Sequence, residues 1–96
     1  MNQFLMQIVL VYDIPDDKRR TRMRKTMMGF GTPVQYSVFE CDLSQRQLQR
    51  MEKAVRAVMR KDEDNVRYYR LCRSCARGAQ VFGGQPITER KELYVV

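Results

Sequence analysis

The residues best suited to chemistry lie in one short stretch, "VYDIPDDKRR", which runs from Val11 to Arg20. Three carboxylates, Asp13, Asp16 and Asp17, follow an apolar segment and are followed at once by cations. Carboxylates bind hard divalent metal ions, and Lys and Arg neutralise phosphate. The stretch therefore indicates a metal-carboxylate site beside a phosphate-binding surface. In the plainer interpretation, Asp13 ends a strand or caps a turn, and Asp16 and Asp17 only begin a helix.

The absence of histidine from the sequence excludes several classes of enzyme. Ser-His-Asp and Cys-His catalysis, imidazole general bases and His-ligated zinc all require that side chain. Hydrolytic chemistry must then rest on carboxylates with a hard metal ion, Mg²⁺ or Mn²⁺, or on lysine and tyrosine.

The three cysteines, Cys41, Cys72 and Cys75, are an odd number and do not suggest a disulfide scaffold. Cys72 and Cys75 form a single C-x-x-C, which is half of a four-thiolate zinc site. Two chains could supply one pair each to a zinc ion. The alternative is a pair of ordinary buried or half-exposed thiols.

The charge of the chain favours partners that carry phosphate. Eighteen Lys and Arg against eleven Asp and Glu give a net charge of +7, and six of the cations fall within Lys18–Lys25. The longest apolar run, Ile8–Tyr12, is far shorter than the ~20 residues that a membrane span needs. No signal segment opens the sequence. We therefore expect a cytoplasmic protein with no membrane association.

The elements that position these residues begin with a strand over Phe4–Ile14, which is apolar on both alternating faces. A helix is predicted over Asp16–Met28, with Met23 and Met27 on its buried stripe and Gly29 or Gly31 at its end. The segment Val34–Cys41 fits one bent strand or two strands, and we favour two.

A capping box at Ser44–Gln47 predicts a second long helix, with an apolar stripe that starts at Leu48 and a basic opposite face. Three further strands are predicted in the C-terminal part: Val66–Cys72, Ala79–Phe82 and Glu92–Val96. The tyrosines expected to pack within strands, and not to stack on bases, are Tyr36, Tyr68 and Tyr69.

This order predicts a single α+β domain over residues 1–96, with the βαββαβ arrangement of a ferredoxin-like sandwich and extra C-terminal strands. Two helices would cover one face of the sheet and leave the second face of the first strand apolar, with Leu5, Val9 and Val11 or their alternates, so we expect a homodimer. Asp13 shares the parity of Val9 and Val11. Two copies of Asp13 could then meet near a two-fold axis, where a metal ion would relieve their repulsion.

Three motifs together resemble the CRISPR-associated protein two family: "VYDIPDDKRR", "GFGTPVQYSVFECDLS" from Gly29 to Ser44, and "VRYYRLCRSC" from Val66 to Cys75. That family acts in spacer acquisition beside the CRISPR-associated protein one integrase. The resemblance implies a ferredoxin-like homodimer whose C-terminal strands, about residues 79–96 here, dock on the partner subunit. It also implies metal-dependent endonuclease activity on RNA or double-stranded DNA in some members and a scaffold role without hydrolysis in others.

The resemblance also assigns roles to individual residues. Asp13 would be the metal-binding and catalytic carboxylate, and Tyr12 would be its catalytic neighbour. The nucleic-acid-binding residues would be Arg19, Arg20, Arg22, Ser37 and Phe39. One position departs from the family pattern, because Pro33 stands where members commonly have a basic residue before Val-Gln.

Three functional hypotheses follow. The leading one is a dimeric, Mg²⁺-dependent phosphodiesterase of CRISPR adaptation. The alternative is a non-catalytic scaffold that binds double-stranded DNA and bridges two integrase dimers. A generic RNA-binding ferredoxin-like module ranks last, because such a module interleaves aromatic and basic residues on a sheet face, whereas the cations here fall on predicted helices.

Overall fold

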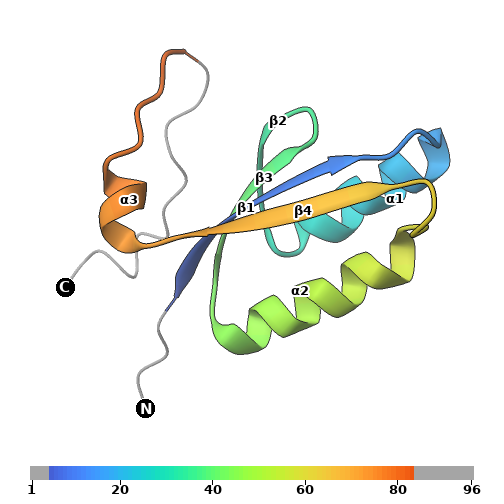
Figure 1. Cartoon of the computed structure of the whole chain (residues 1–96), viewed down its shortest axis with the longest axis horizontal. Helices are drawn as coiled ribbons and strands as arrows, with labels where there is room; N and C mark the ends of the chain where they lie inside the picture. Colours follow the sequence, from blue (N-terminus) through green and yellow to red (C-terminus); the bar gives the residue numbers. More distant parts are fainter. Residues whose placement is uncertain (1–4, 84–96) are drawn as a thin grey trace.

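Seven elements follow one another along residues 5–83, the part of the chain that the computed structural model describes (Figure 1). The strands are β1 (Met6–Asp13), β2 (Gly31–Gln35), β3 (Val38–Leu43) and β4 (Asn65–Leu71). The helices are α1 (Asp17–Met28), α2 (Gln45–Val58) and α3 (Arg73–Arg77). The first six elements have the β-α-β-β-α-β order that the sequence predicted for a ferredoxin-like α+β fold.

Strand β1 lies at the centre of an antiparallel sheet with the strand order β2-β3-β1-β4. Val9, near the middle of β1, pairs with Glu40 on β3 and with Tyr69 on β4. The strand predicted over Phe4–Ile14 is confirmed as β1 in its described part. Because both edges of β1 are paired, its register fixes which of its side chains point to each face.

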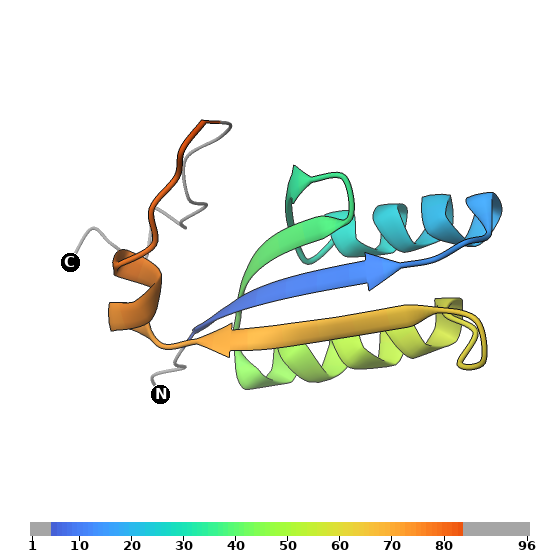
Figure 2. The same cartoon turned by 45° about the horizontal axis from the view of Figure 1, so that its top comes forward.

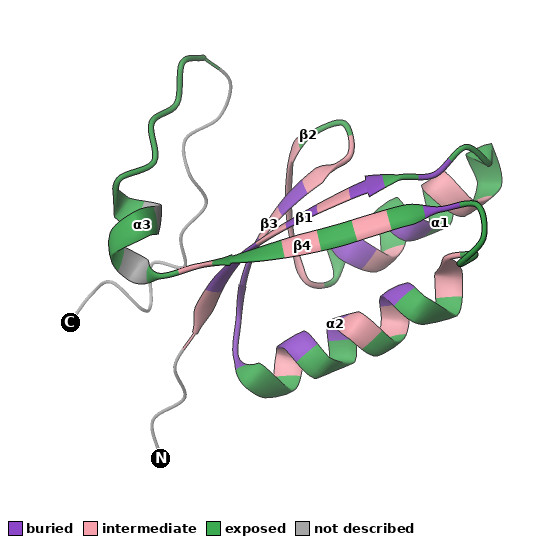
Figure 3. Cartoon of the chain, viewed as in Figure 1, coloured by how far each residue is buried: buried purple, intermediate pink, exposed green. Residues whose placement is uncertain are grey.

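Helices α1 and α2 run along the same face of the sheet (Figure 2). The alternate residues of β1 that point toward them, Ile8, Leu10 and Tyr12, are almost completely buried. Figure 3 shows buried and exposed residues alternating around α2, as expected for an amphipathic helix. The helices and strands contribute these further core side chains: Ile14, Met23, Met27, Phe39, Cys41, Leu43, Leu48, Met51 and Val55.

Helix α1 begins at Asp17 because Asp16 caps it. The Asp16 carboxylate accepts a hydrogen bond from the backbone N–H of Arg19 at 2.9 Å, and Asp17 lies in the first turn. At the other end, the N–H of Gly29 donates to the carbonyls of Met27 and Thr26. The predicted helix over Asp16–Met28 is therefore confirmed, with Asp16 as its cap.

Helix α2 begins with the predicted capping box. The Ser44 N–H donates to Gln47 Oε1 at 2.8 Å, and the Gln47 N–H donates to Ser44 Oγ at 3.2 Å. One turn further on, Glu52 accepts a hydrogen bond from the Tyr68 hydroxyl at 2.5 Å and so ties α2 to β4. Within residues 5–83, none of the helices is long and apolar enough to cross a membrane.

Strands β2 and β3 form a hairpin, which confirms the prediction of two strands in place of one bent strand. A tight approach between them requires a glycine at position 31. A Cβ atom on Gly31 would overlap the Cys41 sulfur and the Glu40 carbonyl oxygen. The hairpin turns at Tyr36 and Ser37, so Tyr36 lies outside the strands and is 82% exposed. The prediction that Tyr36 packs within a strand was wrong.

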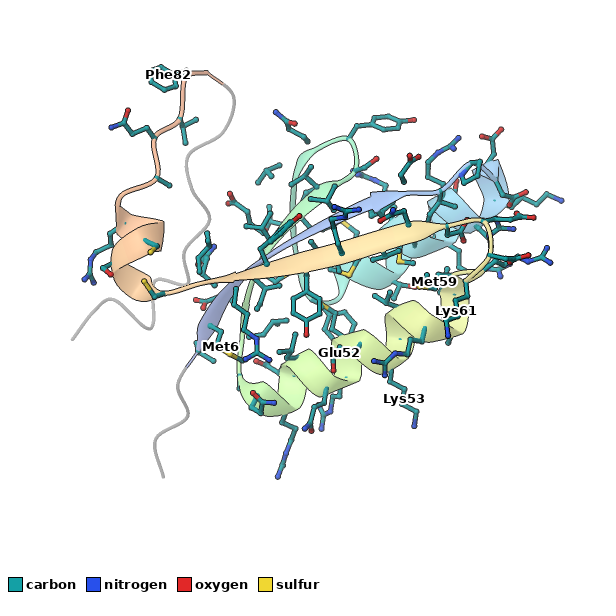
Figure 4. All side chains as sticks on the ribbon, in the orientation of Figure 1. Met6, Glu52, Lys53, Met59, Lys61 and Phe82 are labelled. Carbon is teal, nitrogen blue, oxygen red and sulfur yellow. The ribbon has the colours of Figure 1, made fainter. Side chains whose placement is uncertain are left out.

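The chain after β4 differs from the sequence prediction. Arg73–Arg77 forms the short helix α3, and Ala79–Phe82, predicted as a strand, has no strand structure in the protomer. A strand needs a neighbouring backbone to bond with, and this segment extends away from the sheet (Figure 1). Phe82 is 92% exposed near its tip (Figure 4). The predicted strand Glu92–Val96 lies outside the described residues.

The close approach at Gly31 generates a test of the hairpin. Replacing Gly31 by Ala should lower the free energy of unfolding by about 1–3 kcal/mol, because the added methyl group must displace backbone and a buried sulfur. Gly29→Ala is the matched control, since a Cβ at Gly29 would meet only the Thr26 carbonyl oxygen at 3.4 Å, an ordinary contact. Urea denaturation of both variants measures the difference. Equal stabilities would show that the hairpin accommodates the methyl group.

Candidate metal and phosphate-binding site

Asp13 is the last residue of β1, and its side chain is exposed. Its neighbour across the β1–β4 ladder is Asn65. Since alternate residues of a strand point to opposite faces, Asp13 shares the face of Val9 and Val11, whereas Tyr12 points toward the helices. The parity predicted from the sequence is confirmed.

The face that carries Asp13 is covered by neither α1 nor α2. Val9, Val11 and Val38, which pairs with Val11, are half-buried, and Tyr69, which pairs with Val9, is 52% exposed. This face of β1 is therefore apolar at Val9 and Val11, as expected from the sequence, whereas their cross-strand neighbours include the charged Glu40 and Arg67. A surface of this kind is suited to burial against another molecule.

One protomer offers a small set of metal ligands at this strand end. Asp13 and Asn65 supply oxygen atoms, the ligand type that hard divalent ions bind. The described residues contain no group of three or more His, Cys, Asp and Glu side chains that could hold a metal ion. Mg²⁺ is commonly held by one or two carboxylates, with water and substrate phosphates as its other ligands. The Asp13 carboxylate fits such a site, and a second carboxylate would have to come from another molecule.

Tyr12 lies on the opposite side of the strand from Asp13. Its side chain is only 3% exposed, and its ring stacks against Phe39 with a distance of 6.3 Å between ring centroids. Its backbone N–H donates to the Ser37 carbonyl oxygen at 3.1 Å. Phe39 is fully buried, so Phe39 and Ser37 hold Tyr12 in place in this structure.

A groove of about 550 Å³ lies beside Tyr12, between α1 and the β2–β3 hairpin. Burial raises the pKa of the Tyr12 phenol, although the positive charges of Arg24 and Arg20 act in the opposite direction. The phenol therefore keeps its proton at neutral pH and can donate a hydrogen bond. The groove is lined by Tyr12, Arg20, Thr21, Arg24, Pro33, Val34, Gln35 and Tyr36.

Arg19, predicted to contact nucleic acid, is engaged within the protomer. Its guanidinium forms two hydrogen bonds of 2.9 Å to the Asp64 carboxylate, whose side chain is 0% exposed, and one of 2.9 Å to Glu63. These partners raise the pKa of Arg19, with the Asp64 hydrogen bond as the largest cause. The Arg60 N–H also donates to Asp64 at 2.8 Å. This ion pair joins the start of α1 to the turn that leads into β4.

Arg20 and Arg22 have different surroundings. Arg20 donates to the carbonyl oxygen of Ile14 at 2.8 Å and also pairs with Asp17. Because Ile14 directly follows Asp13 in the chain, these contacts hold the Arg20 guanidinium near the end of β1. Arg22 is exposed on the outer side of α1. A second open depression of about 460 Å³ lies there, lined by Asp17, Lys18, Thr21, Arg22 and Lys25.

The sequence prediction of site residues did not include two members of the groove. Arg24 follows Arg20 by four residues, and this helical spacing was the signal that could have placed both on one side of α1. Tyr36 could not be identified, because the pattern of Val34–Cys41 did not locate the turn. In the structure, its exposed side chain lines the same groove as Arg20 and Arg24, a combination suited to a nucleotide base and its phosphate.

Comparisons with known proteins agree on one family. The model of the family described as CRISPR associated protein Cas2 matches residues 6–78. A curated relative from Synechocystis, named CRISPR-associated endoribonuclease Cas2 3, is 40% identical over 81 residues, which cover 84% of this chain and 88% of the relative. The CRISPR-associated endoribonuclease Cas2 1 of Chloroflexus aurantiacus is 37% identical over 95 residues, with 95% and 100% coverage.

Solved structures share the fold. A hypothetical protein from Thermus thermophilus superposes with a TM-score of 0.77 at 33% identity, over 88% of this chain and 99% of that chain. A chain from a partial Cas6-RT-Cas1–Cas2 complex superposes with a TM-score of 0.67 at 25% identity, over 88% and 99% of the two chains. The ferredoxin-like domain is thus common to these proteins.

The ion pair of Arg19 generates a prediction about acid stability. Asp64→Asn should lower the urea midpoint at pH 7, because it leaves the Arg19 charge with a weaker partner. Arg19 is the main cause of a lowered pKa of Asp64, with help from the Arg60 N–H and against the effect of burial. A lowered pKa gives stability that is complete above the unfolded value, near 3.9, and is lost as the pH falls through the folded value.

The difference between the wild type and Asp64→Asn should therefore shrink as the pH is lowered from 7 toward about 3. Asp62→Asn, a change of the same charge at an exposed position in the same turn, is the control and should leave the midpoint nearly unchanged. If the difference between the two urea midpoints stayed constant with pH, the ion pair with Arg19 would not be the cause of the lowered pKa of Asp64.

Proposed function

Because this chain belongs to the Cas2 family of CRISPR-associated proteins, we propose that it is a metal-dependent endonuclease that hydrolyses RNA and takes part in spacer acquisition. The observation that supports this most directly is the exposed carboxylate of Asp13 at the end of the central strand. Relatives over most of the chain are named endoribonucleases, which favours RNA over double-stranded DNA as the substrate.

The active form in this proposal is a homodimer joined through the face of β1 that the helices leave uncovered. The half-buried Val9 and Val11 and the exposed Tyr69 supply apolar surface for such an interface. Asp13 lies on the same face, so a two-fold axis near the end of β1 brings two carboxylates together. Their mutual repulsion favours a cation between them.

The metal ion in this proposal is Mg²⁺ or Mn²⁺, held by Asp13 from each subunit. When bound, such an ion polarises a phosphate or lowers the pKa of a bound water. Asp13 is the catalytic residue of the chain because it would hold this ion at the reacting phosphate. Tyr12 is a positioning residue, since it is buried on the other side of the strand.

The cations of α1 would hold the RNA backbone. Arg20 is anchored at the Ile14 carbonyl, so its charge lies near Asp13 without a large loss of side-chain entropy on binding. Arg22 and Arg24 lie on two further sides of the helix and extend the positive surface. Arg19 contributes by holding α1 against the turn before β4.

A protein partner follows from the same family membership. One structural neighbour comes from a complex that contains Cas1 and Cas2. We therefore propose that this chain associates with a CRISPR-associated protein one integrase.

The first test of the nuclease assigns the active site. Asp13→Ala should reduce metal-dependent cleavage of single-stranded RNA by more than about a hundredfold, because it removes the proposed metal ligand. RNA binding and the dimeric mass measured by light scattering should be retained. Asp62→Ala, which removes an exposed carboxylate elsewhere, is the control.

Undiminished cleavage by Asp13→Ala would exclude the assigned site. A wild-type protein that binds nucleic acid tightly but cleaves neither RNA nor duplex DNA with Mg²⁺ or Mn²⁺ would favour the scaffold alternative. Duplex DNA serves as the second substrate in the same assay.

The second test concerns the groove beside Tyr12. Arg24→Ala should weaken binding of single-stranded RNA and reduce the slope of log affinity against log salt by about 0.7, the value expected for one lost phosphate contact. Lys61→Ala removes the same charge from the exposed turn after α2 and is the control. Identical salt slopes for the wild type and Arg24→Ala would show that phosphates do not reach the groove.

A further inference from the structure

Two of the three cysteines lie at the junction between β4 and α3. Cys72 directly follows the last residue of β4, and Cys75 lies within α3. Both are exposed and in the free thiol state, whereas the third cysteine, Cys41, is free but 1% exposed in the core. The pair is therefore accessible to small reagents and separate from the nuclease site proposed above.

The two residues are already in contact. The backbone N–H of Cys75 donates to the sulfur of Cys72 at 3.3 Å, and the Ser74 hydroxyl lies 3.2 Å from the same sulfur. The Cys75 thiol also hydrogen-bonds to Cys72. A disulfide requires Cβ atoms about 3.5–4.5 Å apart, so its formation needs a local rearrangement of this junction. The junction between β4 and α3 therefore places the two cysteines next to each other.

We propose that Cys72 and Cys75 are a redox-active dithiol that reacts reversibly with small disulfides of the glutathione class. Cys72 is the attacking thiol, and Cys75 resolves the mixed disulfide. Reversibility follows from the short loop, because closing so few residues removes little entropy from the unfolded chain and stabilises the disulfide only weakly.

The order of attack follows from the hydrogen bonds. The thiol of Cys75, the Ser74 hydroxyl and the Cys75 N–H all stabilise the Cys72 thiolate and lower the pKa of Cys72 to about 7. The hydrogen bond to Cys72 and, second, the negative charge of Cys72 raise the pKa of Cys75. At neutral pH, Cys72 is thus partly thiolate, the form that attacks a disulfide.

The reaction balances in two steps. The Cys72 thiolate attacks one sulfur of the oxidant, forms a mixed disulfide and releases one thiolate. Cys75 then loses its proton to water and attacks the Cys72 sulfur, which closes the Cys72–Cys75 bond and releases the second thiolate. The two cysteine sulfurs are oxidised by two electrons in total, and the oxidant is reduced to two thiols.

Two other interpretations of the cysteines, with Cys41 as the reactive thiol or with Cys72 and Cys75 as zinc ligands, are less consistent with the structure. Burial raises the pKa of Cys41 to about 12, so that residue is neither ionised nor accessible. A four-thiolate zinc site would need two more ligands, and residues 5–83 contain no cluster of three or more potential metal-binding side chains.

The test uses the full chain as purified, folded and reduced. Incubation with oxidised glutathione at pH 7 should consume two of its three thiols and produce a Cys72–Cys75 disulfide, identified by peptide mapping. Reduced glutathione should restore both thiols. Cys41 should remain free throughout.

Two matched variants test the roles of the cysteines. Cys75→Ser should accumulate a glutathione adduct at Cys72 about fivefold faster than Cys72→Ser does at Cys75. This ratio combines the larger thiolate fraction of Cys72 with the lower nucleophilicity of a less basic thiolate. Both residues are exposed, so both variants should fold, and circular dichroism checks this.

Three results would overturn the proposal. The first is a wild-type protein that keeps all three thiols in oxidised glutathione. The second is equal reactivity of the two serine variants. The third is tightly bound zinc at one ion per two chains, which would place the cysteines in an intermolecular metal site.

Discussion

The pairing of β1 on both edges is the constraint on which the rest of the structure depends. With β3 on one side and β4 on the other, β1 cannot shift by one residue without breaking two ladders and exposing its buried set. This register places the Tyr12 side chain in the core and the Asp13 side chain on the opposite face of the sheet. The same register places the apolar Val9 and Val11 on the uncovered face, together with the acidic Asp13 at the end of the strand. A surface for association and a candidate metal ligand therefore arise from one strand.

The basic residues of α1 are not equivalent, although they form a continuous run in the sequence. Arg19 is held by the buried carboxylate of Asp64, and Arg20 is partly neutralised by Asp17. Arg22 and Arg24 project from different sides of the helix into separate depressions. A net charge of +7 thus overstates the number of cations at any single phosphate-binding surface. On helix α2, exposed cations such as Lys53 form another basic face (Figure 4).

The two proposed reactive sites lie at different ends of the sheet. The proposed nuclease site lies where β1 ends and α1 begins, whereas the thiol pair lies where β4 ends and α3 begins. β1 and β4 are antiparallel, so these two junctions lie at opposite ends of the sheet. Oxidation of the thiols would therefore act on the segment that follows α3 and not directly on Asp13. The two proposals can succeed or fail independently.

The sequence alone determined the features that depend on neighbours in the chain. The helix caps at Asp16 and Ser44, the parity of Asp13 and the βαββαβ order follow from local hydrogen bonding and side-chain alternation. Only the tertiary structure showed that Arg19 pairs with Asp64, 45 residues away, that Tyr36 lies at an exposed turn, and that Ala79–Phe82 forms no strand in the protomer. Such features depend on which distant backbone or side chain is brought close, and a pattern of residue types does not contain that information.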